Sequence, residues 1–374
     1  MSGSLAGQWA EARRVMVMRL DNIGDVVMTG PVLRALKENL PEASITLMAS
    51  PGGKAAAPLL PWVDEVISWR VIWQDVGGKL SFDPARELEM IDTLKRCSYD
   101  AAIILTSFKQ TPHPAGYACY LAGIPLRLGE SKEFGGGVLT DEVPPAPDGL
   151  HQAERNLRAI EHAGFRVDDR SLSVSLSEAA RAGAAGLLEE RGIVPGSPYV
   201  LLNPWASASA RVYPPDRFTL AARRISQETG WPVVVSGADA DRGRSGRVLD
   251  ALSARGVDLV GATTLPELAA LVEGARLVLT NNTSTMHLLD ALRVPGVVTY
   301  SGTELEEQWR PRHAPHRLLR RETWCSPCYA FECPYNLECL DIPSEEVAQA
   351  GLSLIAETGG ETEPASLQRE PGKS

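Results

Sequence analysis

Two successive series of short apolar runs, separated by amphipathic stretches of helical length, constrain the fold of this 374-residue chain. A run of about five apolar residues suits a buried strand, and an amphipathic stretch of about ten or more suits a covering helix. This alternation predicts parallel sheets with crossover helices, because parallel neighbours need a long connection. The length suits two domains of this kind.

The first series spans residues 13–185, after a predicted flexible tail at 1–12. Strands are predicted at 15–18, 44–48 and 101–105, and helices at 32–40, 88–95 and 152–163. The second series spans residues 186–345, with strands predicted at 199–202, 232–236, 277–280 and 296–300 and helices at 218–228, 265–272 and 285–292. A polar tail at 359–374 is predicted to be disordered. We expect an α/β fold with two Rossmann-like αβα domains facing an interdomain cleft.

The composition argues against several classes of function. The net charge is −10, from 37 Lys and Arg against 47 Asp and Glu, which is the opposite sign to that of most nucleic-acid-binding proteins. No segment approaches the roughly 18 apolar residues of a membrane span, and the N-terminus lacks the apolar core of a signal peptide. We expect a cytoplasmic, monomeric protein without nucleic-acid partners, with a peripheral membrane contact left open.

In parallel sheets, ligands bind beyond the carboxyl ends of strands, so the loops there are expected to carry the chemistry. The segment after the first predicted strand reads R-L-D-N-I-G-D-V-V-M-T-G-P at 19–31. Gly24 permits a close approach of backbone to a ligand. Asp25 is either a helix cap or a base that takes a proton from an acceptor hydroxyl. Because Pro31 suits a helix that starts near residue 29, we favour a loop position for Asp25.

A run of small polar residues follows the strand predicted at 277–280 and ends where a helix begins. Free N–H groups at a helix N-terminus bind anions. The five small polar residues at 281–285 are more than a helix cap requires. We therefore predict a diphosphate site here, with a histidine one turn into the helix as a further contact or a packing residue. The predicted contacts are Asn282, Thr283, Ser284, Thr285 and His287.

Two other loops reach the same sheet edge. Ser207 and Arg211 follow the strand at 199–202, and a guanidinium can bind two phosphate oxygens, although it suits a surface ion pair equally well. Gly237 and Asp239 follow the strand at 232–236, where a carboxylate can bind a ribose diol. Neither G-x-G-x-x-G nor a P-loop motif occurs, so NAD-dependent and kinase functions lack their fingerprints.

Together these motifs resemble one family. R-L-D-N-I-G-D-V at 19–26, R-V-Y-P at 211–214, G-A-D at 237–239 and T-N-N-T-S-T-M-H at 280–287 look like the ADP-heptose heptosyltransferases of lipopolysaccharide synthesis, glycosyltransferase family 9. The resemblance covers about residues 14–345. It implies a GT-B fold, an acceptor on the first domain, a nucleotide sugar on the second, and a helix at 346–358 that returns to the first domain. It also implies inversion at the anomeric carbon without a catalytic metal ion.

By the same resemblance, Asp25 would deprotonate the acceptor. Arg211 stands where the family usually has a Lys that neutralises the departing diphosphate, and Asp239 would bind the ribose. Asn282 and Ser284 replace the Asp and Gly of the usual T-N-D-S-G-P-M-H. These two changes leave the donor sugar open, and they motivate the alternative of a non-catalytic sugar-nucleotide-binding or scaffold protein.

The acceptor is less constrained. Residues 1–185 hold 19 Lys and Arg against 23 Asp and Glu, so the predicted acceptor domain lacks the bulk positive charge that would suit a phosphorylated lipopolysaccharide core. An uncharged or cationic acceptor, such as an aminoglycoside, is therefore an alternative to the lipopolysaccharide core. Asn22 and Lys109 are candidate acceptor contacts, and Lys109 could equally be a solvated surface residue.

Four of the six cysteines crowd into one segment as C-x2-C-x4-C-x5-C, at Cys325, Cys328, Cys333 and Cys339. Four thiolates at such spacing can surround a tetrahedral metal ion, and disulfides are less expected in a reducing cytoplasm. The spacing is tighter than in the common zinc pattern, so a structural Zn or Fe site and free thiols both stay open. Catalysis itself is expected to need no cofactor.

Overall fold

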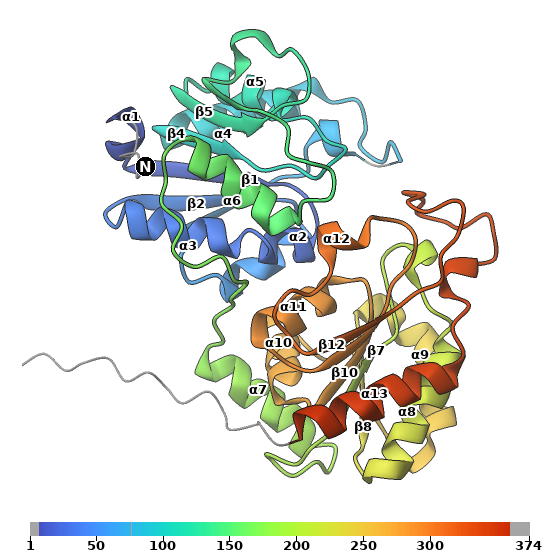
Figure 1. Ribbon diagram of the computed structural model, residues 1–374. Coiled ribbons are helices and arrows are strands. Elements are labelled where there is room, and N and C mark those ends of the chain that lie inside the picture. Colours follow the sequence, from blue (N-terminus) through green and yellow to red (C-terminus); the bar gives the residue numbers. More distant parts are fainter. Residues whose placement is uncertain (1–6, 76, 360–374) are drawn as a thin grey trace, which may run out of the picture.

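The computed structural model describes residues 7–75 and 77–359 as two α/β units, each built on a six-stranded parallel sheet (Figure 1). The strands of the first sheet are β1 (Arg14–Arg19), β2 (Ser44–Ala49), β3 (Glu65–Ser68), β4 (Ala101–Ile104), β5 (Leu126–Glu130) and β6 (Asp141–Val143). Those of the second are β7 (Val200–Asn203), β8 (Val233–Gly237), β9 (Gly256–Val260), β10 (Leu277–Asn281), β11 (Gly296–Thr299) and β12 (His316–Leu319).

Helices cover both sheets. The first unit contains α1 (Gly7–Ala10), α2 (Ile23–Val27), α3 (Gly30–Asn39), α4 (Pro84–Cys97), α5 (His113–Leu121) and α6 (Gln152–His162). The second contains α7 (Glu178–Glu189), α8 (Pro215–Thr229), α9 (Arg242–Leu252), α10 (Leu265–Gly274), α11 (Ser284–Leu292), α12 (Glu306–Trp309) and α13 (Ser344–Thr358). Short 3-10 helices lie at Gly53–Leu59, Ile72–Gln74, Gly136–Val138, Ser209–Arg211, Asp239–Asp241, Ser253–Arg255 and Glu338–Leu340.

Both sheets have the strand order of a Rossmann fold. The orders are β3-β2-β1-β4-β5-β6 and β12-β11-β10-β7-β8-β9, so each chain path reverses direction at the centre of its sheet. Ligands bind at this reversal, beyond the carboxyl ends of the two central strands. The residues after β1 and β4, and those after β7 and β10, are therefore the places where this fold positions a site. The predicted α/β class and paired Rossmann-like units are confirmed.

Part of the predicted N-terminal tail is ordered. Residues 7–10 form α1, in which Trp9 is only 2% exposed and packs edge-on against Phe165, with ring centroids 5.8 Å apart. The indole is large enough to add this short segment to the core of the first unit. Residues 1–6 of the predicted tail lie outside the described residues.

The boundary between the units lies earlier than the predicted residue 185, because α7 runs through that position. This helix packs against α10 of the second unit, where Gly183 lies against the side chain of Glu267 and Arg181 forms an ion pair with Glu273. The second unit therefore begins with α7.

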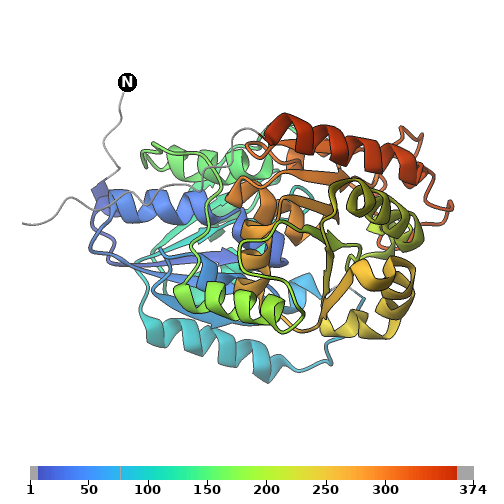
Figure 2. The ribbon, with the colours of Figure 1, turned by 90° about the horizontal axis from the view of Figure 1, so that it is seen from below.

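The C-terminal helix does not return to the first unit, contrary to the prediction for residues 346–358. Helix α13 lies alongside α8 of the second unit in both views (Figures 1 and 2). Gly351 approaches Ile225 and Leu277, while Val347 and Leu354 join the core of that unit. The apolar face of α13 therefore packs within the second unit. Apart from Gly359, the tail predicted at 359–374 lies outside the described residues.

The two units meet through α2, α6 and the segment around α12. Helix α2 packs on α11, and the rings of Phe108 and Trp309 meet edge to face across the junction. An ion pair joins Arg312 to Glu154 of α6. No helix among the described residues has the length and apolar character of a membrane span.

Candidate functional site

Asp25 lies at the junction of the two units, in the first turn of the short helix α2. The sequence favoured a loop position, and this detail is wrong. A helix does begin at Gly30, but the five-residue α2 precedes it. The Oδ2 atom of Asp25 accepts the backbone N–H of Asn22 at 3.1 Å, as a capping residue does. The side chain keeps 15% of its surface exposed, so capping leaves part of the carboxylate accessible.

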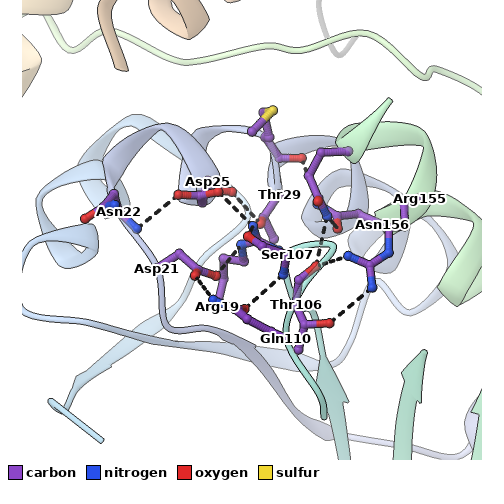
Figure 3. A network of polar contacts seen from close by, with 12 residues as sticks. Arg19, Asp21, Asn22, Asp25, Thr29, Thr106, Ser107, Gln110, Arg155 and Asn156 are labelled. Atoms are coloured by element: carbon purple, nitrogen blue, oxygen red, sulfur yellow. Dashed lines mark hydrogen bonds and ion pairs between the residues drawn. The ribbon is translucent and has the colours of Figure 1, made fainter. Parts of the chain in front are cut away.

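A fully buried arginine holds the Asp25 carboxylate in place (Figure 3). The Nη2 atom of Arg19 lies 2.8 Å from both Asp25 Oδ1 and Ser107 Oγ, and its Nε atom lies 3.1 Å from Asp21 Oδ2. Gln110 donates from Nε2 to Asp21 Oδ1 at 2.6 Å and accepts the Ser107 N–H at 2.9 Å. The guanidinium thus joins the segment after β1 to the loop after β4, the two central strands of the first sheet.

The two carboxylates around Arg19 differ in their surroundings. Burial raises the pKa of Asp21 above its ordinary value, and the nearby charge of Asp25 raises it further, while Arg19 opposes both effects. Of these two carboxylates, Asp25 is the one at the junction, because its charge also acts on His287 and Glu304 of the second unit. The arrangement therefore presents one acidic side chain toward the second unit and keeps the other inside the first.

Helix α6 supports the segments that follow β1 and β4. Arg155, 3% exposed, donates to Glu130 Oε1 at 2.9 Å and to the carbonyl of Thr106 at 2.6 Å. Asn156, from the same helix, donates to the carbonyl of Met28 at 3.4 Å. These contacts tie the segments after β1 and β4 to one helix, which fixes the surroundings of Asp25 (Figure 3).

In the second unit, the predicted diphosphate segment begins with side chains that brace the sheet edge. Asn282 is 3% exposed, and its Oδ1 accepts the N–H and the hydroxyl of Ser301, each at 3.2 Å. The hydroxyl of Thr285 is buried against Asn203, from which it accepts a hydrogen bond at 3.0 Å. The N–H of Thr283 is also used, because it donates to the carbonyl of residue 281 at 2.8 Å. Side chains 282 and 285 therefore point into the protein.

His287 occupies the contact between the two units. A Cβ atom built on Gly24 would lie 2.5 Å from its Cδ2 atom, so α2 can approach α11 this closely only with glycine at position 24. Burial lowers the pKa of His287 to about 4, against the opposing charges of Asp25 and Asp290. The imidazole is therefore neutral near pH 7. Gly24 makes room for this ring, and its predicted close approach to a ligand stays a prediction.

Arg211 faces the same junction, but its guanidinium is already paired. Its Nη2 atom lies 2.7 Å from Glu304 Oε1, and the two side chains are 28% and 20% exposed. Burial and the charge of Asp25 raise the pKa of Glu304, whereas Arg211 lowers it. Glu304 was not predicted from the sequence. The available signal was an acidic residue shortly after the strand predicted at 296–300, at the same sheet edge.

The remaining predicted contacts have other neighbours. Asp239 is exposed and forms an ion pair with Arg242 at 2.7 Å, and Ser207 is exposed at the surface. Gly237 lies against the indole of Trp205, where a Cβ atom would come within 2.5 Å of a ring carbon. Ser207 follows β7 and Asp239 follows β8, as predicted, whereas Gly237 is the last residue of β8 itself.

The two candidate acceptor contacts, Asn22 and Lys109, lie in the first unit. Asn22 is exposed and is the N-cap residue just before α2. The ammonium nitrogen of Lys109 lies 3.4 Å from the ring centroid of Tyr329, a cation–π contact that joins the loop after β4 to the cysteine-rich segment of the second unit. Lys109 is therefore not merely a solvated surface residue.

The four cysteines of that segment line one cavity of about 350 Å³, together with Trp324 and Tyr335. The backbone N–H of Tyr335 donates to the sulfur of Cys333 at 3.3 Å. Within residues 7–75 and 77–359, however, no three His, Cys, Asp or Glu side chains are grouped so that they could hold a metal ion. All four thiols are free in the structure, and the Zn or Fe site stays a prediction.

Comparison with known proteins identifies the family. Residues 88–338, more than half of the chain, match the model described as glycosyltransferase family 9 (heptosyltransferase). The chain belongs to glycosyltransferase family 9. It is therefore a glycosyltransferase, and the alternative of a non-catalytic binding or scaffold protein is not supported.

Among curated relatives, lipopolysaccharide heptosyltransferase 3 of Escherichia coli K12 is 26% identical over 300 residues, which cover 77% of this chain and 82% of the relative. Lipopolysaccharide heptosyltransferase 2 of Salmonella typhimurium is 24% identical, with 92% and 99% covered.

Two solved structures show the same GT-B fold. A family 9 glycosyltransferase of Veillonella parvula has a TM-score of 0.76 at 20% identity, covering 95% of this chain and 100% of that one. E. coli ADP-heptose lipopolysaccharide heptosyltransferase II has a TM-score of 0.72 at 21% identity, covering 92% and 99%.

Gly24→Ala tests the contact between the two units. The added methyl group meets the His287 ring, and we expect it to reduce the free energy of unfolding by about 2 kcal/mol. Urea unfolding measures the change. Gly186→Ala in α7 is the control, because its Cβ would meet nothing within 4 Å and alanine favours a helix. Equal stability of the two variants would contradict the tight approach of α2 to α11.

His287 predicts a pH dependence of stability. The folded protein holds its pKa at about 4, so the unfolded chain, with an ordinary value of about 6.5, binds the proton first as the pH falls. The corresponding stability is present above pH 7 and is lost between about pH 6.5 and 4. Between pH 7 and 5, wild type should lose about 2 kcal/mol more than His287→Gln in urea unfolding. Parallel pH profiles of the two proteins would rule out this contribution.

Proposed function

We propose that this glycosyltransferase transfers a heptose or related sugar from an ADP-sugar to an acceptor hydroxyl, with inversion at the anomeric carbon. The names of its relatives support the donor class, since they include lipopolysaccharide heptosyltransferases and an ADP-heptose enzyme. One observation carries the proposal. Asp25 of the first unit and Arg211 of the second face one junction, where Glu304 binds Arg211 and is influenced by the charge of Asp25.

In this proposal Asp25 is the general base. Its exposed carboxylate surface accepts the proton of the acceptor hydroxyl as the oxygen attacks the anomeric carbon. The bond from that carbon to the diphosphate breaks in the same displacement, which inverts the configuration. Arg19 is a positioning residue, because its hydrogen bond to Oδ1 fixes the carboxylate while Oδ2 is held by the Asn22 N–H.

Charge leaves with the diphosphate, and the second unit offers groups that stabilise it. Arg211 supplies a permanent cation. The N–H groups of Ser284 and Thr285 lie in the first turn of α11, a nine-residue helix whose N-terminus favours an anion. The N–H of Thr283, predicted to share this role, already donates to residue 281. These protein groups compensate the negative charge of the leaving diphosphate. We therefore propose that no catalytic metal ion is required.

The acceptor is proposed to bind to the first unit, beside Asp25 and the loop that carries Lys109. A lipopolysaccharide core is suggested by the names of the relatives. The small excess of acidic residues in the first half of the chain keeps an uncharged or cationic small natural product, such as an aminoglycoside, as the other acceptor class. A ribose contact at Asp239, a cytoplasmic site of action and a monomeric state stay predictions from the sequence.

Asp25→Asn tests the assignment of the base. We expect transfer from ADP-heptose to fall by about a thousand-fold, since removal of a general base costs about 10²–10⁴ in rate. Binding of ADP, followed by the rise in melting temperature, should change little because Arg211 and α11 are untouched. Mass spectrometry of the product measures transfer.

Asp92→Asn is the matched control, because Asp92 is exposed on α4 and should leave both readouts unchanged. Transfer by Asp25→Asn within two-fold of wild type would remove Asp25 from the mechanism. A wild-type protein stabilised by UDP, GDP or dTDP but not by ADP would instead overturn the donor assignment.

A further inference from the structure

Glu304 is an acidic residue at the junction that has no part in the proposed reaction. It lies on the segment after β11, and its carboxylate is bound to Arg211, the cation proposed to meet the diphosphate. The Nε atom of Arg211 is buried and makes no hydrogen bond within the described residues. In the part of the chain that the structure describes, the guanidinium pairs with Glu304, an anion as a phosphate oxygen would be.

The backbone that carries Glu304 is fixed from two sides. Asn282 accepts two hydrogen bonds from Ser301, whose hydroxyl lies 3.0 Å from that of Thr303. From the other side, the N–H groups of Cys328 and Tyr329 donate to the carbonyls of residues 302 and 303 at 3.0 and 2.9 Å. A fixed backbone leaves side-chain rotation as the means by which the Glu304 carboxylate can leave Arg211.

These contacts also answer a question raised by the sequence. Position 282 carries Asn where an acid was expected to grip donor-sugar hydroxyls, but its side chain is buried and turned toward Ser301. Glu304 is a carboxylate at the junction on the donor side, next to the proposed diphosphate cation. A diphosphate bound to Arg211 would bring the first atoms of its sugar toward this carboxylate.

Electrostatics make an exchange of partners reasonable. Burial and the negative charge of Asp25 both raise the pKa of Glu304, and Arg211 is the group that offsets them. A diphosphate that takes Arg211 brings further negative charge and leaves the carboxylate without its cation. The carboxylate then needs hydrogen-bond donors, and sugar hydroxyls attached to the diphosphate are donors at the right place.

We propose that Glu304 is a specificity-determining residue for the donor. Its carboxylate occupies Arg211 in the free enzyme, is displaced by the donor diphosphate, and then accepts hydrogen bonds from hydroxyls of the transferred sugar. The inference rests on the proposed function, because it assumes that Arg211 binds the diphosphate. Under this proposal, a diphosphate without a sugar only competes with Glu304 for Arg211. A complete nucleotide sugar also gains hydrogen bonds from its sugar to Glu304.

Calorimetric titration of wild type and Glu304→Gln with pyrophosphate, ADP and ADP-heptose tests this exchange. The variant lacks the competing charge, so pyrophosphate and ADP should bind about five-fold more tightly than to wild type. The advantage of ADP-heptose over ADP should fall by about ten-fold, because an uncharged amide is a weaker acceptor than a carboxylate. Glu304→Ala should change both quantities in the same directions.

Glu306→Gln is the matched control. Glu306 lies two residues further along, and its carboxylate oxygens are 3.9 Å from Arg310 and 3.8 Å from Arg320. We expect wild-type affinities from it. Unchanged or weaker pyrophosphate binding by both Glu304 variants would overturn the displacement step. An undiminished advantage of ADP-heptose would overturn the sugar contact.

The pyrophosphate measurements separate this inference from the donor assignment. If wild type prefers another nucleoside diphosphate to ADP, the ADP part of the proposed function fails, and the pyrophosphate comparison still decides whether Glu304 competes for Arg211. If pyrophosphate affinity is the same in wild type and Arg211→Met, Arg211 is not the diphosphate cation and the inference fails with it.

Discussion

Helices α2 and α11 approach each other so closely that Gly24 has no room for a side chain beside the His287 ring. The contact connects the two units at the point where each Rossmann-like sheet reverses its strand order. Asp25 follows Gly24 directly, so the carboxylate of the first unit is presented to the second. A neutral imidazole suits this contact, because a charged ring would have to be buried between the units.

Opposite charges are arranged differently on the two sides of the junction. In the first unit, the fully buried Arg19 shares one guanidinium between Asp21 and Asp25, which leaves an excess of negative charge at the proposed base. In the second unit, Arg211 and Glu304 form one partly exposed pair. The first arrangement is locked by burial and hydrogen bonds. The second can exchange partners, and that difference suits a fixed base and an arriving anionic donor.

The sequence was sufficient for the class of fold and the central strands, because the apolar runs of β1, β4, β7 and β10 are buried on both faces. It was insufficient for α2, whose five residues are too few to show a helical period, and for β3, a partly exposed edge strand. The predicted partner of α13 came from the resemblance to the family, and it was wrong because the apolar face of this helix packs against α8 and the core of its own unit. Asp25 and Arg211 were found through motifs, whereas Glu304 is a single acid whose importance depends on a contact between distant segments.

The most direct test of the central claim is a crystal structure of the enzyme with an ADP-sugar that cannot be transferred. We expect the diphosphate to lie on Arg211 and the N-terminus of α11, with Glu304 released from the guanidinium and the anomeric carbon facing Asp25. A donor whose diphosphate lies away from Arg211, or whose anomeric carbon points away from Asp25, would overturn the proposed roles of these two residues.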